Sequence, residues 1–527
     1  MEKVEQIERW SGQLGEVAEG MAGWREENPK ATLREIEKEI DRRWARVRAQ
    51  MVTDLAVESK AGDWSQVAKG EEPVCPECGT KIKAEGGKKK RRLQTQGGKN
   101  WYWSDNMGYV LPAKVVFSPL DEELALVPGR MTPIVHENLV RLGAWMPFEE
   151  AAKMLKVFSG AQVSEFTARQ NSLAAGEACV SEQNEEVERL ERETPVAPTG
   201  PAKALLSADG AFVPVLHGEW AEVKTVVIGE VTEPVWDAKS KEWVVHSRNH
   251  SYFSRLAEAA AFDRLALVET QRRGVENAGK VGAVQDGAEW LQGFTDYHRP
   301  DAVRILDFAH ATSYVSKIGQ ATFGAESAQL VVWLQERLHQ LKHTGPDQLL
   351  VELGDLVKAH PAAQTLRLPE ALAYLEKRRD QMQYHLFVEQ GWPIGSGAME
   401  SANKVVVEAR LKGAGMHWAR PHVDPMLALR NIVCNDRWET QWPVIESRLR
   451  TQARQERAKR RSQRASAFSP QPLPQPVLPK QLPVSTSLLS PPPPSTTAHR
   501  RPAPDHPWRR SPIGRARFSS PPSPGKL

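Results

Sequence analysis

Ala204-Leu-Leu-Ser-Ala-Asp209-Gly begins the stretch of sequence that decides the fold. It is the first of five segments rich in β-branched, aromatic and aliphatic residues, which are typical of strands. The other four are residues 220–229, 242–253, 280–286 and 302–307. Apolar residues at helical spacing occupy 256–272, between the third and fourth of these segments, and 288–294, between the fourth and fifth. The predicted order is three strands in an antiparallel meander, a helix, a strand, a helix and a strand.

This order is typical of an α/β fold with an RNase H-like mixed sheet. In that fold the first and fourth strands lie side by side, so Asp209 and Asp286 should meet at one end of the sheet. Each aspartate follows an apolar run and precedes a glycine, which lets the backbone turn behind the carboxylate. A single Asp-Gly pair is more often only a turn, so these residues gain their meaning from the predicted architecture.

A third carboxylate, Glu400, follows Pro-Ile-Gly395-Ser-Gly397-Ala-Met and opens a helix-forming stretch. Its glycines indicate either a flexible loop or an ordered helix start whose amides orient a phosphate. Three neighbouring carboxylates do not stay ionised without a cation, and Mg²⁺ prefers oxygen ligands. We expect Asp209, Asp286 and Glu400 to be the catalytic residues and to hold two Mg²⁺ ions, which Mn²⁺ can replace.

Residues 201–310 and 392–450 are predicted to form the two parts of this catalytic core. Between them, residues 311–391 contain helical patterns at 328–341, 349–360 and 368–390 and are expected to form an all-helical insertion. Residues 451–527 are dominated by Pro, Ser, Arg and Gln and are expected to be a disordered tail. The arginines of this tail either bind nucleic acid loosely or have no role.

The N-terminal part is predicted to be a helical and β-ribbon DNA-binding region. Residues 1–66 show the spacing of amphipathic helices. Residues 67–131 contain Cys75-Pro-Glu-Cys78 and then a hairpin that turns at Gly97-Gly98. Two thiolates do not complete a four-ligand zinc site, so tightly bound zinc is not expected. The basic side chains suited to a phosphate backbone are Lys88, Lys89, Lys90, Arg91 and Arg92.

Residues 132–200 are predicted to contain a helix-turn-helix. Residues 148–155 form the first helix, a turn passes through Gly160, and a second helix begins with Ser164 as N-cap. Arg169 and Gln170 lie near the start of this second helix, where base-reading side chains occur. A plain helical hairpin gives a similar pattern.

Composition limits the functional classes. The chain has 527 residues, a net charge of +4 and four cysteines, which fits a reducing compartment and argues against a disulfide scaffold. The charged N-terminus lacks the apolar core of a signal peptide, and no apolar run is long enough to span a membrane. A cytoplasmic protein without a membrane partner is expected.

Longer motifs then point to a family. They are Ser-Ala-Asp209-Gly, Gly-Glu-Trp-Ala-Glu-Val-Lys224, Arg-Arg-Gly-Val-Glu-Asn-Ala-Gly279, Val-Gln-Asp286-Gly-Ala-Glu-Trp290, Arg-Ile-Leu-Asp307-Phe-Ala-His310-Ala, Gly-Trp-Pro-Ile-Gly-Ser-Gly-Ala-Met-Glu400-Ser-Ala-Asn-Lys404 and Glu-Ala-Arg-Leu-Lys-Gly-Ala-Gly-Met-His417-Trp418. Across about residues 70 to 445 the chain resembles the DDE transposases of bacterial insertion sequences, in particular the ISKra-type family of the Mutator-like superfamily.

The resemblance implies a two-metal-ion reaction that cuts DNA at the ends of a mobile element and joins the freed 3′-hydroxyl to target DNA. It matches Asp209, Asp286 and Glu400 to the metal-binding triad, and Asp307 and His310 to an Asp-x-x-His signature. The partners expected are DNA and further copies of the chain assembled on it, in association with a bacterial nucleoid. The additional side chains expected to contact DNA are His310, Lys404, Arg410 and Lys412, although His310 is more often a residue that holds a strand.

One departure from the family pattern is the lack of a second Cys-x-x-Cys before Pro119-Leu-Asp-Glu122. It leaves open a degenerate, inactive transposase copy. A DNA-binding repressor without catalysis is the rival class, and a nuclease or resolvase of the RNase H-like type is a third. The long helical insertion and the separate N-terminal region favour a transposase over a nuclease.

Overall fold

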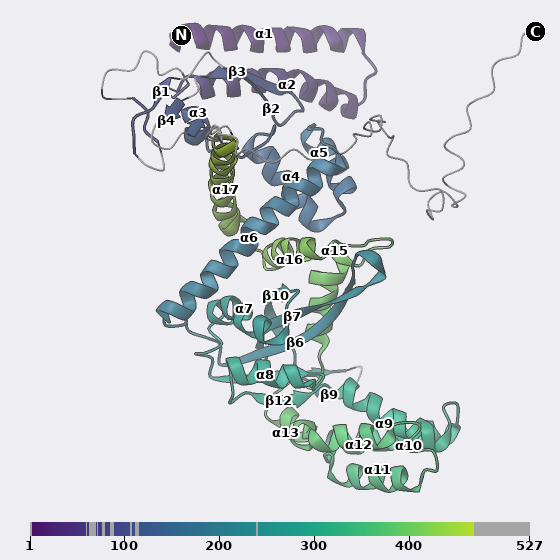
Figure 1. The fold of residues 1–527 in the computed structure, drawn as a ribbon. Coiled ribbons are helices and arrows are strands. Elements are labelled where there is room, and N and C mark those ends of the chain that lie inside the picture. The colour runs from purple at the N-terminus through teal and green to yellow at the C-terminus, as the bar shows by residue number, and fades with distance from the viewer. Residues whose placement is uncertain are drawn as a thin grey trace, which may run out of the picture. The chain divides into compact units, whose positions relative to one another are not determined.

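The computed structural model describes residues 3–59, 61–62, 70, 72–75, 79–84, 89–105, 108–110, 115–238 and 241–467. Contacts group Met1–Ala467 into one compact unit, which Figure 1 shows as a coloured ribbon. The tail from residue 468 onward lies outside the described residues. The last helix, α17 (Trp438–Ala467), continues past the tail boundary expected at residue 451. The reason is local: residues 451–467 are rich in Arg, Ala and Gln and contain no proline, so they favour a helix.

The centre of the unit is a mixed sheet of five strands in the order β10-β7-β6-β11-β12. These strands are β6 (Lys203–Pro214), β7 (Trp220–Val231), β10 (Ser247–Arg255), β11 (Lys280–Gln285) and β12 (Val303–Leu306). The pairs β10–β7 and β7–β6 are antiparallel, whereas β11 runs parallel to both β6 and β12. The α/β class and the predicted adjacency of the first and fourth strands are therefore confirmed.

The third predicted strand, residues 242–253, is wrong in its bounds. Its start is β9 (Glu242–Val244), which pairs with β8 (Val235–Asp237) as a separate two-stranded hairpin. Only β10 joins the sheet, and its pairing with β7 shifts between Arg248 and Ser251. Asn249 lies in this irregularity with a φ of 52°, so regular pairing is interrupted there.

Side chains from the two faces of the sheet enter different hydrophobic clusters. On one face, Leu206 and Val226 pack with Phe262 of α7 (Ala259–Arg272) and Phe294 of α8 (Glu289–His298). On the other face, residues of β6 and β7 such as Val213 and Val223 pack with the helical segment around Val406 and with α16 (Arg420–Cys434). The alternation along β6 places Asp209 on this second face.

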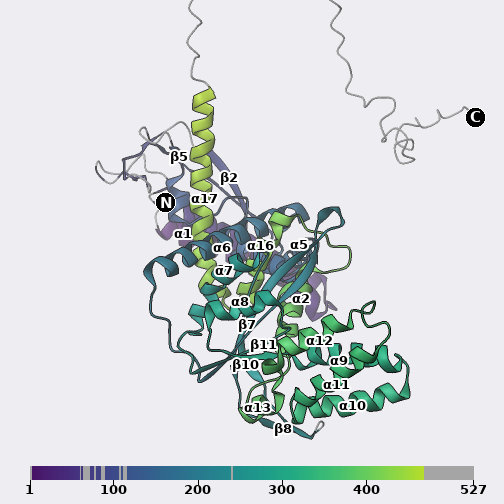
Figure 2. The same cartoon turned by 60° about the horizontal axis from the view of Figure 1, so that its bottom comes forward.

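The helical insertion lies beside the β12 edge of the sheet, and its helices share a hydrophobic core with Val284, Ile305 and Leu306 of the sheet (Figures 1 and 2). Its helices are α9 (Phe308–Phe323), α10 (Ala328–His343), α11 (Asp347–Ala359), α12 (Leu368–Lys377), η3 (Arg379–Met382) and α13 (Tyr384–Glu389). The prediction that this region is helical is confirmed. Leu341, Leu353 and Leu375 are buried in this core, as their helical spacing indicates.

The N-terminal region contains the predicted helices and hairpin. The helices are α1 (Lys3–Glu27), α2 (Leu33–Val57), α3 (Pro119–Glu123), α4 (Pro133–Trp145), α5 (Phe148–Ser159) and α6 (Glu165–Glu193). The short strands are β1 (Lys83–Ala84), β2 (Lys89–Gln94), β3 (Asn100–Asp105), β4 (Gly108–Val110) and β5 (Val115–Phe117). Strands β2 and β3 pair antiparallel around Gly97-Gly98, as predicted.

The hairpin turn packs directly on the turn between α5 and α6. Gly97 donates its amide to the Ser159 carbonyl at 2.7 Å. A Cβ atom on Gly98 would lie 2.2 Å from the Gly160 carbonyl oxygen, so only glycine fits this approach. The β2–β3 hairpin and the α5–α6 turn are thus joined through backbone atoms.

Across the described residues, every helix is too short or too polar to cross a membrane.

Candidate active site

Asp209 and Asp286 lie at neighbouring strands. Asp209 is in β6, and Asp286 directly follows the last residue of β11, the strand that pairs with β6. The pKa of Asp209 is raised to about 6, chiefly by burial and also by the charges of Asp286 and Glu222. Hydrogen bonds from the Gly210 amide at 2.7 Å and from the Asn403 side chain at 3.0 Å oppose this rise. Asp209 is thus a carboxylate whose negative charge lacks a balancing cation.

Asp286 sits in a tight turn before α8. Its Oδ1 accepts the Ala288 amide at 2.9 Å, and Gly287 has a φ of 79°, which favours glycine. The turn therefore fixes the direction in which the chain leaves β11. Among the described residues, no hydrogen bond to the second carboxylate oxygen of Asp286 is seen, so this oxygen could serve as a ligand.

Glu400 stands apart from the two aspartates. It lies in α14 (Gly397–Ala402), its side chain is 64% exposed, and the nearest cation is Lys404 at 3.9 Å. Within the described ranges, no three His, Cys, Asp or Glu side chains come close enough to hold a metal ion together. The expected meeting of all three carboxylates is therefore not present in this conformation.

Asn403 takes the place beside Asp209 in which a ligand from this helix was expected. Its amide nitrogen donates to Asp209 Oδ2, and its buried Oδ1 has no partner among the described residues. Asn403 begins a π-helical turn, η4 (Asn403–Glu408), between α14 and α15 (Ala409–Leu411). Sequence reasoning missed Asn403, although it follows Glu400 by only three residues on the same helix.

The buried guanidinium of Arg430 stabilises this π-helical turn. Its Nε donates to the Val406 carbonyl at 3.2 Å, and its Nη2 donates to the Val405 carbonyl. Carbonyls that lose their usual partner in a widened turn need such a donor when they are buried. The irregular helix is therefore built into the core and not a frayed end.

Asp307 connects the strand ends to the loop that carries Glu400. Its Oδ1 accepts the His310 amide as the N-cap of α9, and its Oδ2 accepts the Ser396 amide, each at 2.7 Å. The Phe308 amide adds a bond to the Ile394 carbonyl at 2.9 Å. The role of Asp307 in this structure is to hold the Gly395-Ser-Gly397 loop. His310 is partly buried, with its ring 5.4 Å from that of Tyr314.

Two further charged residues belong to the surroundings of Asp209. Lys224 of β7 is 5% exposed, pairs with Glu222 at 2.8 Å and lies 5.1 Å above the Trp290 ring. A Cβ on Gly210 would lie 2.3 Å from the Glu222 side chain, so glycine after Asp209 makes room for this carboxylate. The sequence contained a signal for both, because they fall in Gly-Glu-Trp-Ala-Glu-Val-Lys224.

The donor set fits a hard divalent cation. Asp209 and Asp286 supply carboxylate oxygens, and Asn403 supplies an amide oxygen without a partner. A cation there would neutralise the charge that raises the pKa of Asp209. Asp209, Asp286 and Asn403 are the residues that would hold it, with Glu400 available on the adjacent helix.

Of the basic residues predicted to contact DNA in the β2–β3 hairpin, Lys88 and the side chains of Lys89 and Lys90 lie outside the described residues. Arg91 pairs with the largely buried carboxylate of Asp121, whereas Arg92 is exposed. Cys75 is buried, and Cys78 also lies outside the described residues. The zinc prediction therefore stays a prediction.

The α5–α6 corner has the predicted helix-turn-helix form. Helix α5 ends at Gly160 with a φ of 68°, and Ser164 caps α6 by accepting the Thr167 amide. Arg169 and Gln170 are exposed in the first turns of α6. The choice between a DNA-reading helix and a plain helical hairpin stays open.

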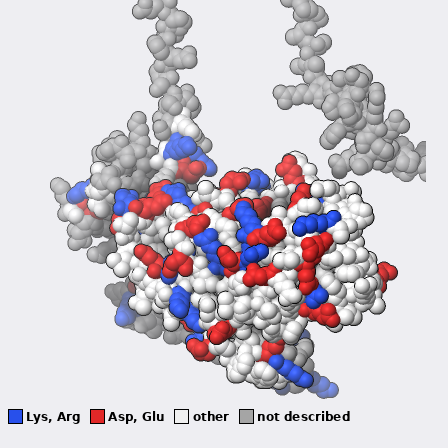
Figure 3. Space-filling model, turned by 90° about the horizontal axis from the view of Figure 1, so that it is seen from below, with Lys and Arg blue, Asp and Glu red and all other residues white. Residues whose placement is uncertain are grey.

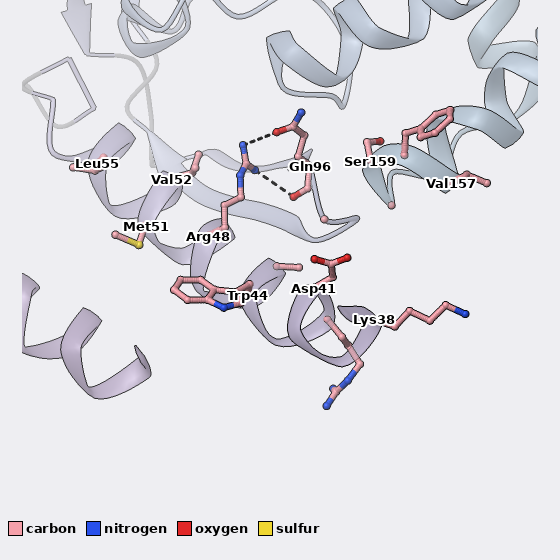
Figure 4. A pocket seen from close by; sticks show the side chains of 15 residues that line it. Lys38, Asp41, Trp44, Arg48, Met51, Val52, Leu55, Gln96, Val157 and Ser159 are labelled. Atoms are coloured by element: carbon pink, nitrogen blue, oxygen red, sulfur yellow. Dashed lines mark hydrogen bonds between the residues drawn. The ribbon is translucent and has the colours of Figure 1, made fainter. Parts of the chain in front are cut away.

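A hollow of about 800 Å³ separates α2 from the end of α5. Figure 4 shows Arg48 of α2 reaching to Gln96 in the β2–β3 turn, with Trp44 and Val157 on opposite walls. Arg48 donates to the Gln96 side chain at 3.1 Å and to its carbonyl at 3.2 Å. Its guanidinium therefore has a structural role in tying α2 to the hairpin.

The prediction that Arg410 contacts DNA is wrong. Arg410 is 1% exposed, donates to the Gly143 carbonyl at 2.9 Å and stacks on Phe148 and Trp418. Burial lowers the pKa of Arg410 to about 10. Contacts that depend on Gly143 and Phe148, more than 260 residues before Arg410, cannot be read from local spacing, so the residue looked like a surface cation.

Two other predicted contacts remain at the surface. Lys404 is 70% exposed at its side chain, and Lys412 pairs with Glu408 at 2.8 Å. On the face drawn in Figure 3, Lys and Arg are interspersed with Asp and Glu and do not gather into one patch. The mixed distribution of charges on that face therefore does not indicate an anionic partner.

No protein-family model matches this chain and no curated protein matches it, so its motifs and the geometry of its site carry the functional interpretation.

Proposed function

We propose that this protein is a DDE-type DNA transposase whose five-stranded sheet is an RNase H-like core. It would cut DNA at the ends of an insertion sequence and join the 3′-hydroxyl ends to target DNA. The observation that carries the proposal is the pair Asp209, in the middle of β6, and Asp286, directly after the end of the adjacent strand β11, where burial and the charge of Asp286 raise the pKa of Asp209. Perturbed carboxylates of this kind concentrate at functional sites.

Each residue of the site has a distinct role in the proposed reaction. Asp209 and Asp286 would hold the Mg²⁺ ions, and Asn403 orients Asp209 through its 3.0 Å hydrogen bond. Mg²⁺ held there would supply activation of an attacking hydroxyl and stabilisation of the leaving oxygen. Glu400 completes the site by turning from Lys404, which is possible because its side chain is exposed and only weakly paired.

DNA would be held by the exposed cations near this site and at the N-terminal region. Lys404 and Lys412 would contact phosphates close to the cleavage point. Arg92 would contact the backbone from the hairpin, and Arg169 and Gln170 would reach base edges from the start of α6. The ring of His310 packs near the rings of Tyr314 and Tyr374. We therefore assign His310 a role in packing and no direct part in the reaction.

The test uses full-length protein and labelled duplex DNA taken from the sequence that flanks its gene. Asp209→Asn, Asp286→Asn and Glu400→Gln should each lose Mg²⁺-dependent strand cleavage while DNA binding persists. Asp296→Asn is a matched control, because Asp296 is an exposed carboxylate on α8 that pairs with Arg304. Full cleavage by any of the three variants would remove that residue from the mechanism.

The same experiment addresses the rival function, a DNA-binding repressor without catalysis. The exposed positions of Arg169 and Gln170 on a capped helix favour sequence-specific binding in either case. Tight binding to the flanking DNA without cleavage by the wild-type protein, in Mg²⁺ or Mn²⁺, would support a repressor or an inactive transposase copy.

A further inference from the structure

The helical insertion reaches back to the turn that carries Asp286. Tyr374 and Arg378 lie one helical turn apart at the end of α12, so both face the same neighbour. The Tyr374 hydroxyl donates to the Asp286 carbonyl. Arg378 donates through Nε to the Gly287 carbonyl at 2.7 Å and through Nη2 to the same oxygen. Two successive carbonyls of the turn are thus held by side chains about ninety residues away.

These two side chains are themselves held in place. Arg378 is 5% exposed, lies 4.0 Å above the Tyr374 ring and also contacts Glu289 at 3.1 Å. The Tyr374 ring stacks on Tyr314 of α9, with centroids 4.1 Å apart and planes 10° apart.

The turn is shaped to receive this contact. A Cβ atom on Gly287 would lie 2.4 Å from Arg378 Nε and 2.7 Å from the Tyr374 hydroxyl oxygen. Glycine is therefore required both by the φ of 79° and by the closeness of the two side chains. The insertion also contacts the end of β12. The Tyr384 hydroxyl donates to the carbonyl of Leu306 at 2.9 Å, and Leu306 directly precedes Asp307.

We propose that Tyr374 and Arg378 form a clamp through which the helical insertion positions Asp286 for catalysis. The clamp touches the backbone of the Asp286 turn and not its carboxylate, so both are positioning residues. Whatever moves α12 relative to the sheet, such as DNA bound to the insertion, would then change the distance between Asp286 and Asp209. The insertion thereby becomes a device that controls how well the two carboxylates share a metal. This proposal rests on the proposed function.

The test compares four full-length variants, of which the fourth, Arg378→Lys, keeps the positive charge of Arg378. Tyr374→Phe keeps the stacked ring and removes the donor, and Arg378→Met keeps the aliphatic volume and removes the guanidinium. Lys377→Met is the matched control, because Lys377 forms an ion pair with Glu289 in which both side chains are more than half exposed and does not touch the carbonyls. Thermal unfolding shows that each variant is folded.

The first measurement is hydrogen exchange of the peptide that covers residues 284–290, without DNA. Loss of one carbonyl contact should speed exchange of the turn amides about fivefold in Tyr374→Phe and more in Arg378→Met, with no change in Lys377→Met. This readout does not depend on activity. If wild-type protein cleaves no DNA, the proposed function fails while exchange still decides whether the clamp exists.

The second measurement is strand cleavage as a function of Mg²⁺ concentration. The half-saturating concentration should rise several-fold in both clamp variants, at unchanged DNA affinity, and Arg378→Lys should restore part of the loss. A role in stability alone would lower the folded fraction without moving this midpoint. Unchanged exchange together with an unchanged Mg²⁺ midpoint in both clamp variants would overturn the proposal.

Discussion

Asp209→Asn should make the protein more stable at neutral pH, although it removes a proposed catalytic residue. The pKa of Asp209 rises from 3.8 to about 6 on folding, so between these values the folded state binds the proton more tightly than the unfolded state. The contribution of this carboxyl group to the free energy of unfolding is therefore fully present below about pH 4 and is lost as the pH rises through about 6. The difference corresponds to about 3 kcal/mol at about pH 8 as an upper limit.

The neutral amide also fits the neighbouring hydrogen bonds. It retains an acceptor for the Gly210 amide or Asn403, and its new donor can reach the Asn403 Oδ1 that now has no partner. Urea unfolding of wild type and Asp209→Asn should therefore diverge by about 1 to 3 kcal/mol at about pH 8 and converge at about pH 4. Asp301→Asn removes a carboxylate paired with Arg299 at the surface and should not raise stability.

Wild type and Asp209→Asn can also be compared in the presence of divalent ions. Millimolar Mg²⁺ should raise the midpoint of wild-type unfolding at about pH 8 and leave Asp209→Asn unchanged, because a ligand that binds only the folded state stabilises it. A variant that is less stable than wild type at both pH values would refute the reasoning from buried charge. A Mg²⁺ effect of equal size in both proteins would refute Asp209 as a ligand.

The remaining predictions concern other parts of the molecule. Arg410→Ala should lower the free energy of unfolding by about 2 to 4 kcal/mol, because a buried guanidinium and its ring contacts are lost; DNA affinity of the folded variant should not change. Changing Arg169 and Gln170 to Ala should cost about 1 to 3 kcal/mol for the cognate element end in binding titrations and spare random duplex; equal losses on both DNAs would contradict base reading. Asp307→Ala should release the Ser396 amide and reduce cleavage without reducing DNA affinity, and an unchanged cleavage rate would show that the loop needs no such support.

The sequence was most informative where local pattern and chain order agree. Runs rich in β-branched, aromatic and aliphatic residues located β6, β7 and β11, and the order of elements correctly placed β6 beside β11. The N-cap at Ser164 and the glycine turn between β2 and β3 follow from side-chain chemistry within a few residues. Such features depend on short-range physics, so a single sequence is enough to predict them.

Features that depend on distant segments were missed. The burial of Arg410 depends on Gly143 and Phe148, which lie far from it in the sequence, so local spacing predicts a surface cation instead. Asn403 was overlooked because hydrophobic periodicity does not reveal a π-helical turn. The Tyr374 and Arg378 contacts follow from how the insertion docks on the sheet, which no local pattern encodes.

The π-helical turn of η4 has a consequence for the rotational phase of the helix that carries Glu400. Such a turn is equivalent to an α-helix into which one extra residue has been inserted. One residue corresponds to about 100° of rotation about the helix axis, so Ser396–Glu400 face a direction that an uninterrupted helix anchored at Leu411 would not give them. Deletion of a single residue between Asn403 and Glu408 would restore regular winding and leave the core residues of α15 in place. The carboxylate of Glu400 would then rotate about the helix axis by more than a quarter of a turn. The number of residues between Asn403 and Glu408 therefore determines the direction in which the Glu400 side chain points.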